Sequence, residues 1–264
     1  MSKKDFYIGW QDEMPESTAK FLKKLVTIVG VLVVGLVIVI VTFQRSFNDH
    51  VFEFGSQTEV TGVYIAEPYP MLQITHANLA IDAESVLLVG FGKFGASEIM
   101  NEIEAENGIL DLQEITLKGT LIYGDGVALL ELTDQGDSFV RKSGNFRQPL
   151  VHDKSNSRIS LTGEILDPKC YFGVMKPGEG KIHKSCAIRC LSGGMPPVLR
   201  VWDSSSNTYN YYLLSGKNGV EINSELLPFV GEMITFEGVV YTQLNWNVLE
   251  IDPKKITRTL ANNE

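Results

Sequence analysis

The chain has 264 residues, a formal net charge of −9 and a sequence pI near 5.1. Because binding to nucleic-acid phosphates needs basic patches, this acidic balance argues against a nucleic-acid partner. The length suffices for a membrane anchor followed by one large or two small domains.

An uncharged apolar run, LVTIVGVLVVGLVIVIVTFQ, occupies residues 25–44. It matches the roughly 20 apolar residues that cross a bilayer core of about 30 Å. The alternative is a cleavable signal peptide, which has an apolar region of about 7–15 residues and a small-residue cleavage site. Here the run is longer, acidic residues precede it, and TFQRSFND offers no such site. We therefore predict a cytoplasmic leader over residues 1–24 and a retained transmembrane helix over 25–44, with the lipid bilayer as its partner.

Basic residues are distributed unequally around this span. Five lysines precede it, whereas Arg45 is followed by no Lys or Arg until Lys93. Because loops rich in Lys and Arg stay in the cytoplasm, the N-terminus is expected there. Residues 46–264 are then expected in the periplasm, and the protein in a bacterial inner membrane.

Four sequence blocks occur twice, in the same order, in the rest of the chain. They are TGVYIAEP, LLVGFGKFG, ITLKG and LEL, which return as TGEILDP, LLSGKNG, ITFEG and LEI. Such recurrence is typical of a duplicated module. We predict a first domain over residues 54–136, a polar linker over 137–157, a second domain over 158–256 and a tail over 257–264.

Each copy has segments rich in β-branched and aromatic residues that are bounded by glycine, as strands are. One short helix fits in each copy, at ASEIMNEIEAEN (96–107) and at VEINSELLPF (220–229). The resulting order of three strands, a helix and two strands is that of an OB-fold, a five-stranded Greek-key barrel. The predicted fold class is mostly β, with two tandem OB-like five-stranded barrels after one transmembrane helix. Two small β-sandwiches are the alternative.

The stretch GFGKFG (90–95) formally satisfies the GxGxxG pattern of dinucleotide-binding proteins. The second copy keeps only GKNG at this place, and the helix that follows GFGKFG is acidic, which opposes a pyrophosphate. We therefore expect a turn into a helix here and no dinucleotide.

All three cysteines of the chain and one of its four histidines lie close together, at Cys170, His183, Cys186 and Cys190. In the second copy they fall between the first two strands, in a loop that borders the ligand face of an OB-fold. If HKSCAIRC is helical, its histidine and two cysteines share one face, and Cys170 can join them from the strand end. Three cysteines and one histidine are a known zinc ligand set. We predict one bound metal ion, with zinc favoured over copper or iron.

Two other interpretations of the cysteines remain open. An oxidising compartment favours a disulfide. A bond between Cys186 and Cys190 is awkward, because same-face Cβ atoms four residues apart on a helix lie about 5–6 Å apart, which is longer than the Cβ separation in a disulfide. A bond from Cys170 to either of the other two cysteines is easier. A disulfide would leave one spare thiol. Thiol redox chemistry is the third interpretation.

The segment GEILDPKCYFGVMKPGEGKIHKSCAIRCLSGGMPPVL resembles a family of bacterial membrane-anchored or exported proteins. In that family a DxKCY…HxxCAxxC…GxPP pattern precedes a β-rich, OB-like module, and the likeness covers roughly residues 160–252. It implies no particular activity. The opening DFYIGWQDEMP resembles the cytoplasmic leader on some subunits of bacterial membrane redox complexes, which implies other membrane-protein subunits as partners.

No motif of an enzyme is visible, since the sequence contains no GxSxG, HExxH or CxxCH pattern. We therefore expect an accessory or scaffolding subunit of a larger membrane complex, of the respiratory electron-transport kind, whose cysteine loop is stabilised by a metal. The alternative is a metal-handling or electron-transfer protein that uses the same four residues.

Overall fold

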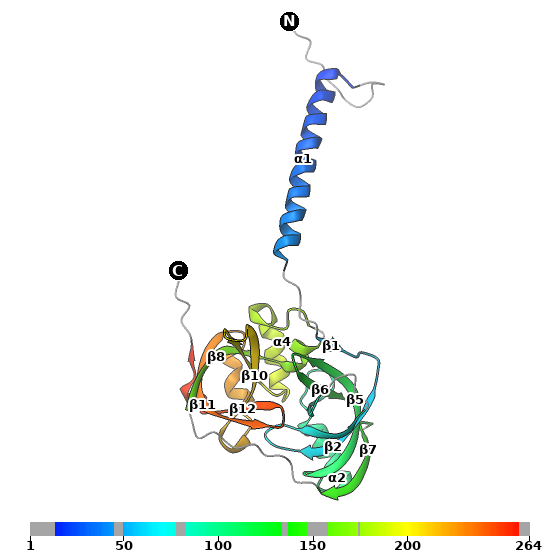
Figure 1. Ribbon diagram of the computed structural model, residues 1–264, viewed down its shortest axis with the longest axis vertical. Helices are drawn as coiled ribbons and strands as arrows, with labels where there is room; N and C mark the ends of the chain where they lie inside the picture. Colours follow the sequence, from blue (N-terminus) through cyan, green and yellow to red (C-terminus); the bar gives the residue numbers. More distant parts are fainter. Residues whose placement is uncertain are drawn as a thin grey trace. The chain divides into compact units, whose positions relative to one another are not determined.

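The computed structural model (Figure 1) describes residues 14–44, 50–77, 83–133, 137–146, 158–173 and 175–258. The chain divides into two compact units, residues 1–47 and residues 48–264.

The first unit contains one helix, α1 (Glu16–Phe43). Its 28 residues correspond to about 42 Å of helix, and none of them is buried within the structure. The helix is long and apolar enough to cross a membrane, a property that signal sequences near an N-terminus share. It begins nine residues before the predicted span, because the segment from Glu16 to Lys24 contains good helix formers and a Glu16–Lys20 ion pair at 2.6 Å.

The first half of the second unit is a closed five-stranded barrel. Its strands are β2 (Thr58–Ile65), β3 (Met71–Ala77), β4 (Ser85–Val89), β5 (Gln113–Gly124) and β6 (Val127–Leu132). They pair in the order β5-β2-β3-β4-β6, and β5 pairs with β6 to close the barrel. Helix α2 (Ser97–Asn107) connects β4 to β5, and β4 and β6 are parallel.

The second half repeats this architecture. Its strands are β8 (Arg158–Leu166), β9 (Val198–Asp203), β10 (Thr208–Ser215), β11 (Met233–Gln243) and β12 (Trp246–Ile251). The order is β12-β10-β9-β8-β11, and β11 pairs with β12. The expected helix of this copy is the short α5 (Asn223–Leu226) followed by the 3₁₀ turn η3 (Leu227–Phe229), since Pro228 cannot continue an α-helix. Two OB-like barrels are thus confirmed, and the sandwich alternative is wrong.

Shorter elements surround the barrels. Strands β1 (Val51–Phe52) and β7 (Phe139–Phe146) add to β5, and β13 (Thr257–Arg258) adds to β11. The remaining 3₁₀ turns are η2 (Lys217–Gly219) and η4 (Pro253–Lys255). Strand β7 lies within the predicted linker, of which residues 147–157 are outside the described residues.

The strand registers match between the two barrels. Ile115 is the partner of Gly62 in the first barrel, and Ile234 is the partner of Gly163 in the second. The threonines that precede these glycines donate or accept the same bond, Thr61 with Thr116 and Thr162 with Thr235, each at 2.8 Å. The recurring sequence blocks therefore occupy equivalent strands, as the duplication predicts.

The core has two parts. One fills the first barrel and includes Leu88, Met100 and Leu130. The other fills the second barrel around Phe236 and also takes in side chains of the first barrel. Tyr69, fully buried, donates a hydrogen bond to the carbonyl of Leu214 at 2.7 Å. The two barrels therefore pack on one another and are not separate domains joined only by a linker.

Candidate metal centre

The cysteine segment is an insertion into the second barrel, between β8 and β9. It spans residues 167–197 and contains α3 (Pro168–Phe172) and α4 (Gly180–Ser192), whereas residues 66–70 suffice to connect β2 to β3 in the first barrel. Asp167 caps α3, because its Oδ1 accepts from the backbone N–H groups of Lys169 (3.0 Å) and Cys170 (3.3 Å). Gly194, at φ +86°, turns the chain after α4.

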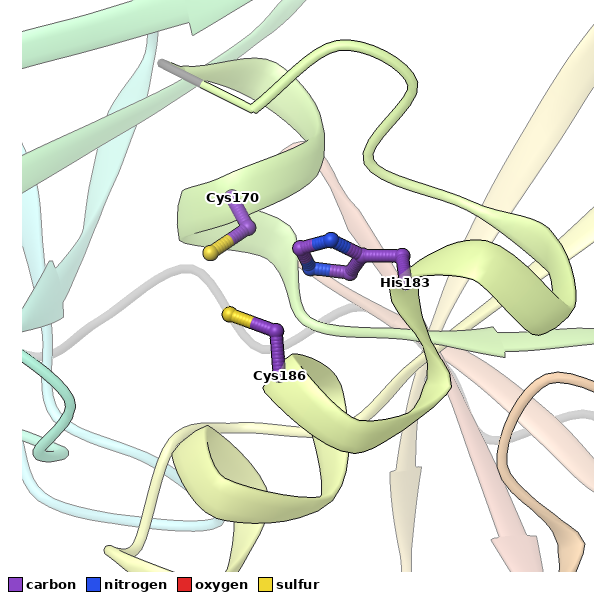
Figure 2. Close-up of side chains that lie close together, drawn as sticks. All are labelled: Cys170, His183 and Cys186. Carbon is purple, nitrogen blue, oxygen red and sulfur yellow. The ribbon is translucent and has the colours of Figure 1, made fainter.

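The insertion brings together three of the four predicted ligands. The sulfurs of Cys170 and Cys186 and a ring nitrogen of His183 all lie within 4.8 Å of one another. Figure 2 shows Cys170 on one helix and the other two side chains on the next, one turn apart, with the two sulfurs directed toward each other. The helical face that the spacing predicted thus forms for His183 and Cys186.

Cys190 belongs to a second group. Its sulfur, that of Cys170 and a carboxylate oxygen of Asp167 also lie within 4.8 Å of one another. The four predicted residues are therefore all gathered around Cys170, but as two overlapping groups rather than as one set of mutual neighbours. The sequence reasoning missed Asp167, although it stands in the DPKCY stretch three residues before the first cysteine.

Two buried polar atoms at this place, His183 Nε2 and Asp167 Oδ2, have no hydrogen-bond partner among the residues that the structure describes. Leaving a buried polar group unpaired costs about 1–3 kcal/mol, so each such atom in a native structure calls for an explanation. Burial lowers the pKa of His183, despite the opposing effect of Asp167. The imidazole is therefore neutral at neutral pH, which is the form that ligates metals.

The three cysteines are free thiols in the structure. The pKa of Cys170 is raised, first by its hydrogen bond with Cys190 and then by burial and the nearby Asp167. Cys170 is consequently a protonated thiol in the metal-free chain, and a metal that binds there displaces a proton. Thiolates and an imidazole suit zinc, copper or iron, so this cluster of cysteines and a histidine can hold a metal ion.

The first barrel also reaches the cluster, through the GFGKFG loop. Lys93 Nζ donates to Cys186 Sγ at 2.9 Å, and this hydrogen bond is the first cause that raises the pKa of Lys93. The backbone N–H of Gly95 donates to the carbonyl of Gly193 at 2.9 Å. A Cβ on Gly95 would lie 2.0 Å from the carbonyl oxygen of Gly194, so the glycine is needed for close approach of the two backbones.

Lys169 holds this loop in place. Its ammonium donates to the carbonyls of Gly90 (2.7 Å) and Gly92 (2.8 Å) and pairs with Glu131 at 2.5 Å. The side chains of Lys169 and Glu131 are only 9% and 11% exposed, so the pair is nearly removed from water. Sequence reasoning found neither Lys93 nor Lys169, since nothing in the spacing relates them to residues of the other copy.

A scan against protein-family models and searches of curated proteins and of solved structures return no match for this chain.

Proposed function

We propose that this chain is a membrane-anchored protein that binds one metal ion through Cys170, His183, Cys186 and Cys190. The observation that carries the proposal is His183 Nε2, a buried nitrogen beside two thiols that has no hydrogen-bond partner in the described part of the chain. A bound metal ion supplies the partner that this nitrogen lacks. Asp167 Oδ2, the second unpaired buried atom, is available as a further ligand or as an acceptor next to the ligands.

Zinc is the metal that the donor set favours. Three thiolates and one imidazole form closed tetrahedral zinc sites, and soft sulfur ligands also accept copper or iron. The ligands connect α3 to α4 across a loop that contains Pro177 and Gly178, so the metal fixes the two helices of the insertion to one another. Its role is accordingly structural in the first instance.

The biological role that we propose is that of an accessory or scaffolding subunit in a larger membrane assembly of the respiratory electron-transport kind. Helix α1 serves as the anchor, since its residues 25–43 carry no charge and five lysines precede them. The barrels then lie on the periplasmic side, where their surfaces meet other subunits. The leader resemblance supports this assignment.

A second function, metal handling or electron transfer, is favoured by one observation. Cys186 is partly exposed, and a site in which all three members of the first group bind leaves one coordination position for Cys190 or for an outside ligand. Such a position permits exchange. A metal that chelators remove within minutes, or a coloured protein, supports this second function over the structural one.

The test is metal content. The full chain is purified in detergent, and its metals are measured by mass spectrometry before and after dialysis against a chelator. We expect about one metal per chain, and a loss of most of it in His183→Gln. His76→Gln is the matched control, because His76 is an exposed histidine of the first barrel. Equal metal content in the two variants would contradict the proposed site.

The location is tested separately. A membrane-impermeant thiol reagent applied to intact, chelator-treated spheroplasts is expected to label Cys186, and gentle purification from native membranes is expected to recover partner subunits. Labelling only after lysis would place the barrels in the cytoplasm and overturn the assignment. Recovery of the chain alone would overturn the subunit role while leaving the metal site untouched.

A further inference from the structure

The three thiols differ in accessibility. Cys170 and Cys190 are 8% and 1% exposed, whereas Cys186 is intermediate. A small reagent from solvent therefore meets Cys186 first. Its sulfur lies within 4.8 Å of that of Cys170, and Figure 2 shows the two sulfurs pointing toward one another.

Lys93 has no part in binding a metal, because an ammonium has no lone pair to donate. The structure nevertheless brings it across from the other barrel to Cys186 at 2.9 Å. Three hydrogen bonds hold the same loop against the second half of the chain, from Gly95 to Gly193 and from Lys169 to Gly90 and Gly92. The approach also requires Gly193, where a Cβ would lie 2.2 Å from the carbonyl oxygen of Lys93.

An ammonium that donates to a sulfur stabilises the negative charge that the sulfur carries while it attacks an electrophile. Oxidation-prone cysteines combine such a cationic neighbour with solvent access and a second cysteine in reach. Cys186 meets all three conditions through Lys93, its partial exposure and Cys170. The Lys93 contact is not needed for holding a metal.

We propose that Cys186 is an oxidation site for hydroperoxides and that Cys170 is its resolving thiol. Cys186 attacks one oxygen of hydrogen peroxide, the O–O bond breaks, and the thiol proton passes to the departing oxygen, so that Cys186 sulfenic acid and one water form. The thiol of Cys170 then attacks the sulfenic sulfur, the S–O bond breaks, and a Cys170–Cys186 disulfide and a second water form. The peroxide is reduced by two electrons, which the two thiols supply.

The oxidation also controls whether the metal ion stays bound, an extension that rests on the proposed function. The disulfide removes two sulfur ligands at once, and one of them, Cys170, is the member shared by both donor groups. His183 and Cys190 alone hold a metal weakly. A peroxide signal therefore releases the ion, and a dithiol reductant restores the site.

The first experiment uses the metal-free full chain in detergent, treated with hydrogen peroxide and mapped by peptide mass spectrometry. We expect a link between Cys170 and Cys186 in the wild type, and a trapped sulfenic acid on Cys186 in Cys170→Ser. Lys93→Met slows the reaction about tenfold, and Lys93→Arg restores most of the rate. Lys217→Met is the matched control, since Lys217 occupies the corresponding turn of the second barrel, and its rate stays that of the wild type.

Three results overturn the proposal: a disulfide between Cys170 and Cys190 as the first product, a covalent bond between Lys93 and Cys186, or equal rates in Lys93→Met and the wild type. The second experiment adds peroxide to the zinc-loaded chain and follows release with a chromophoric chelator. Release at the rate of disulfide formation supports metal control, and oxidation without release overturns it. If the wild type binds no zinc, the proposed function fails, while the metal-free experiment still decides the oxidation site.

Discussion

The two barrels have the same strand order and register, and they differ in the connection between their first and second strands. Residues 66–70 make that connection in the first barrel, and residues 167–197 make it in the second, with two helices and every cysteine of the chain. The first barrel shows that the fold needs no such insertion. The insertion is therefore an addition to a repeated scaffold, and the other copy of the scaffold supplies Lys93 to it.

The largest expected effect comes from replacing Cys170, which lies in the insertion and belongs to both groups of candidate ligands. Cys170→Ser is expected to lower metal affinity by more than about 100-fold, measured by competition with a chelator of known affinity. Hydrogen exchange should speed up in residues 167–197 and stay unchanged in β2 to β6. Ser185→Ala, an exposed position of α4, is the control. Faster exchange throughout the first barrel would mean that the two barrels do not fold independently of the insertion.

The buried ion pair between the barrels comes next. Lys169→Met leaves Glu131 buried without its partner, which costs about 3–5 kcal/mol of unfolding free energy, measured by denaturant titration. Adding Glu131→Gln should recover part of this loss, so a double-mutant cycle gives a large coupling energy. The same cycle with Glu250, the residue equivalent to Glu131 in β12, should give almost none. Similar couplings for both glutamates would contradict the asymmetry between the barrels.

Equivalent glycines test the symmetry of the barrels. A Cβ on Gly62 would lie 2.3 Å from the carbonyl oxygen of Gln73, and one on Gly163 would lie 2.2 Å from that of Arg200. Both alanine variants should therefore lose about 1–3 kcal/mol of stability, as measured by urea unfolding. Glu59→Ala, an exposed position on β2, should change little. One silent glycine variant would show that the two registers are not equally tight.

The smallest effect concerns the turn between the last two strands, where Asp125 stands in the first barrel and the buried Leu244 in the second. Tyr211 donates a hydrogen bond to Asp125 Oδ2 at 2.5 Å, and His50 Nε2 lies 3.1 Å from the same oxygen. The interaction with His50 is the first cause that lowers the pKa of Asp125 below its usual 3.8. Because the pKa of Asp125 is lower in the folded state, its ionised form stabilises the protein at pH values above 3.8. This stabilisation is lost as the pH falls through the folded-state pKa.

Asp125→Asn should therefore lower the unfolding midpoint at neutral pH, and the difference from the wild type should shrink between about pH 5 and pH 2. Circular dichroism during urea unfolding at several pH values measures it. A difference that is constant with pH would mean that ionisation of Asp125 contributes nothing.

Much of the fold was predictable because its signals are local or repeat. Equivalent positions in the two copies are marked by the Thr-Gly pairs, the paired isoleucines and the glycines that bound the strands. Because these signals recur in the same order, they predict the order of the strands and helices. The length of the second copy's helix was not predictable to the same degree, because Pro228 interrupts a segment whose apolar pattern otherwise suits a longer helix.

The candidate site was predictable in composition and not in arrangement. The spacing of His183 and Cys186 predicts a shared helical face, and the structure has it. Whether Cys190 turns toward His183 or toward Asp167 depends on how α4 packs on β8 and on α3, and helical periodicity does not contain that information.

The sequence by itself determined the apolar N-terminal segment, the duplicated barrel and the gathering of three thiols and an imidazole in one loop, because each is written in residues close together or repeated in order. Only the tertiary structure decided that Lys169 donates hydrogen bonds to the GFGKFG loop and that Lys93 donates one to Cys186. Those contacts join residues 79 and 93 positions apart. The Lys169 contact is buried and the Lys93 contact is exposed, and both depend on the close backbone approach of the two packed barrels. No local pattern encodes such a meeting, so it is found only once both barrels are in place.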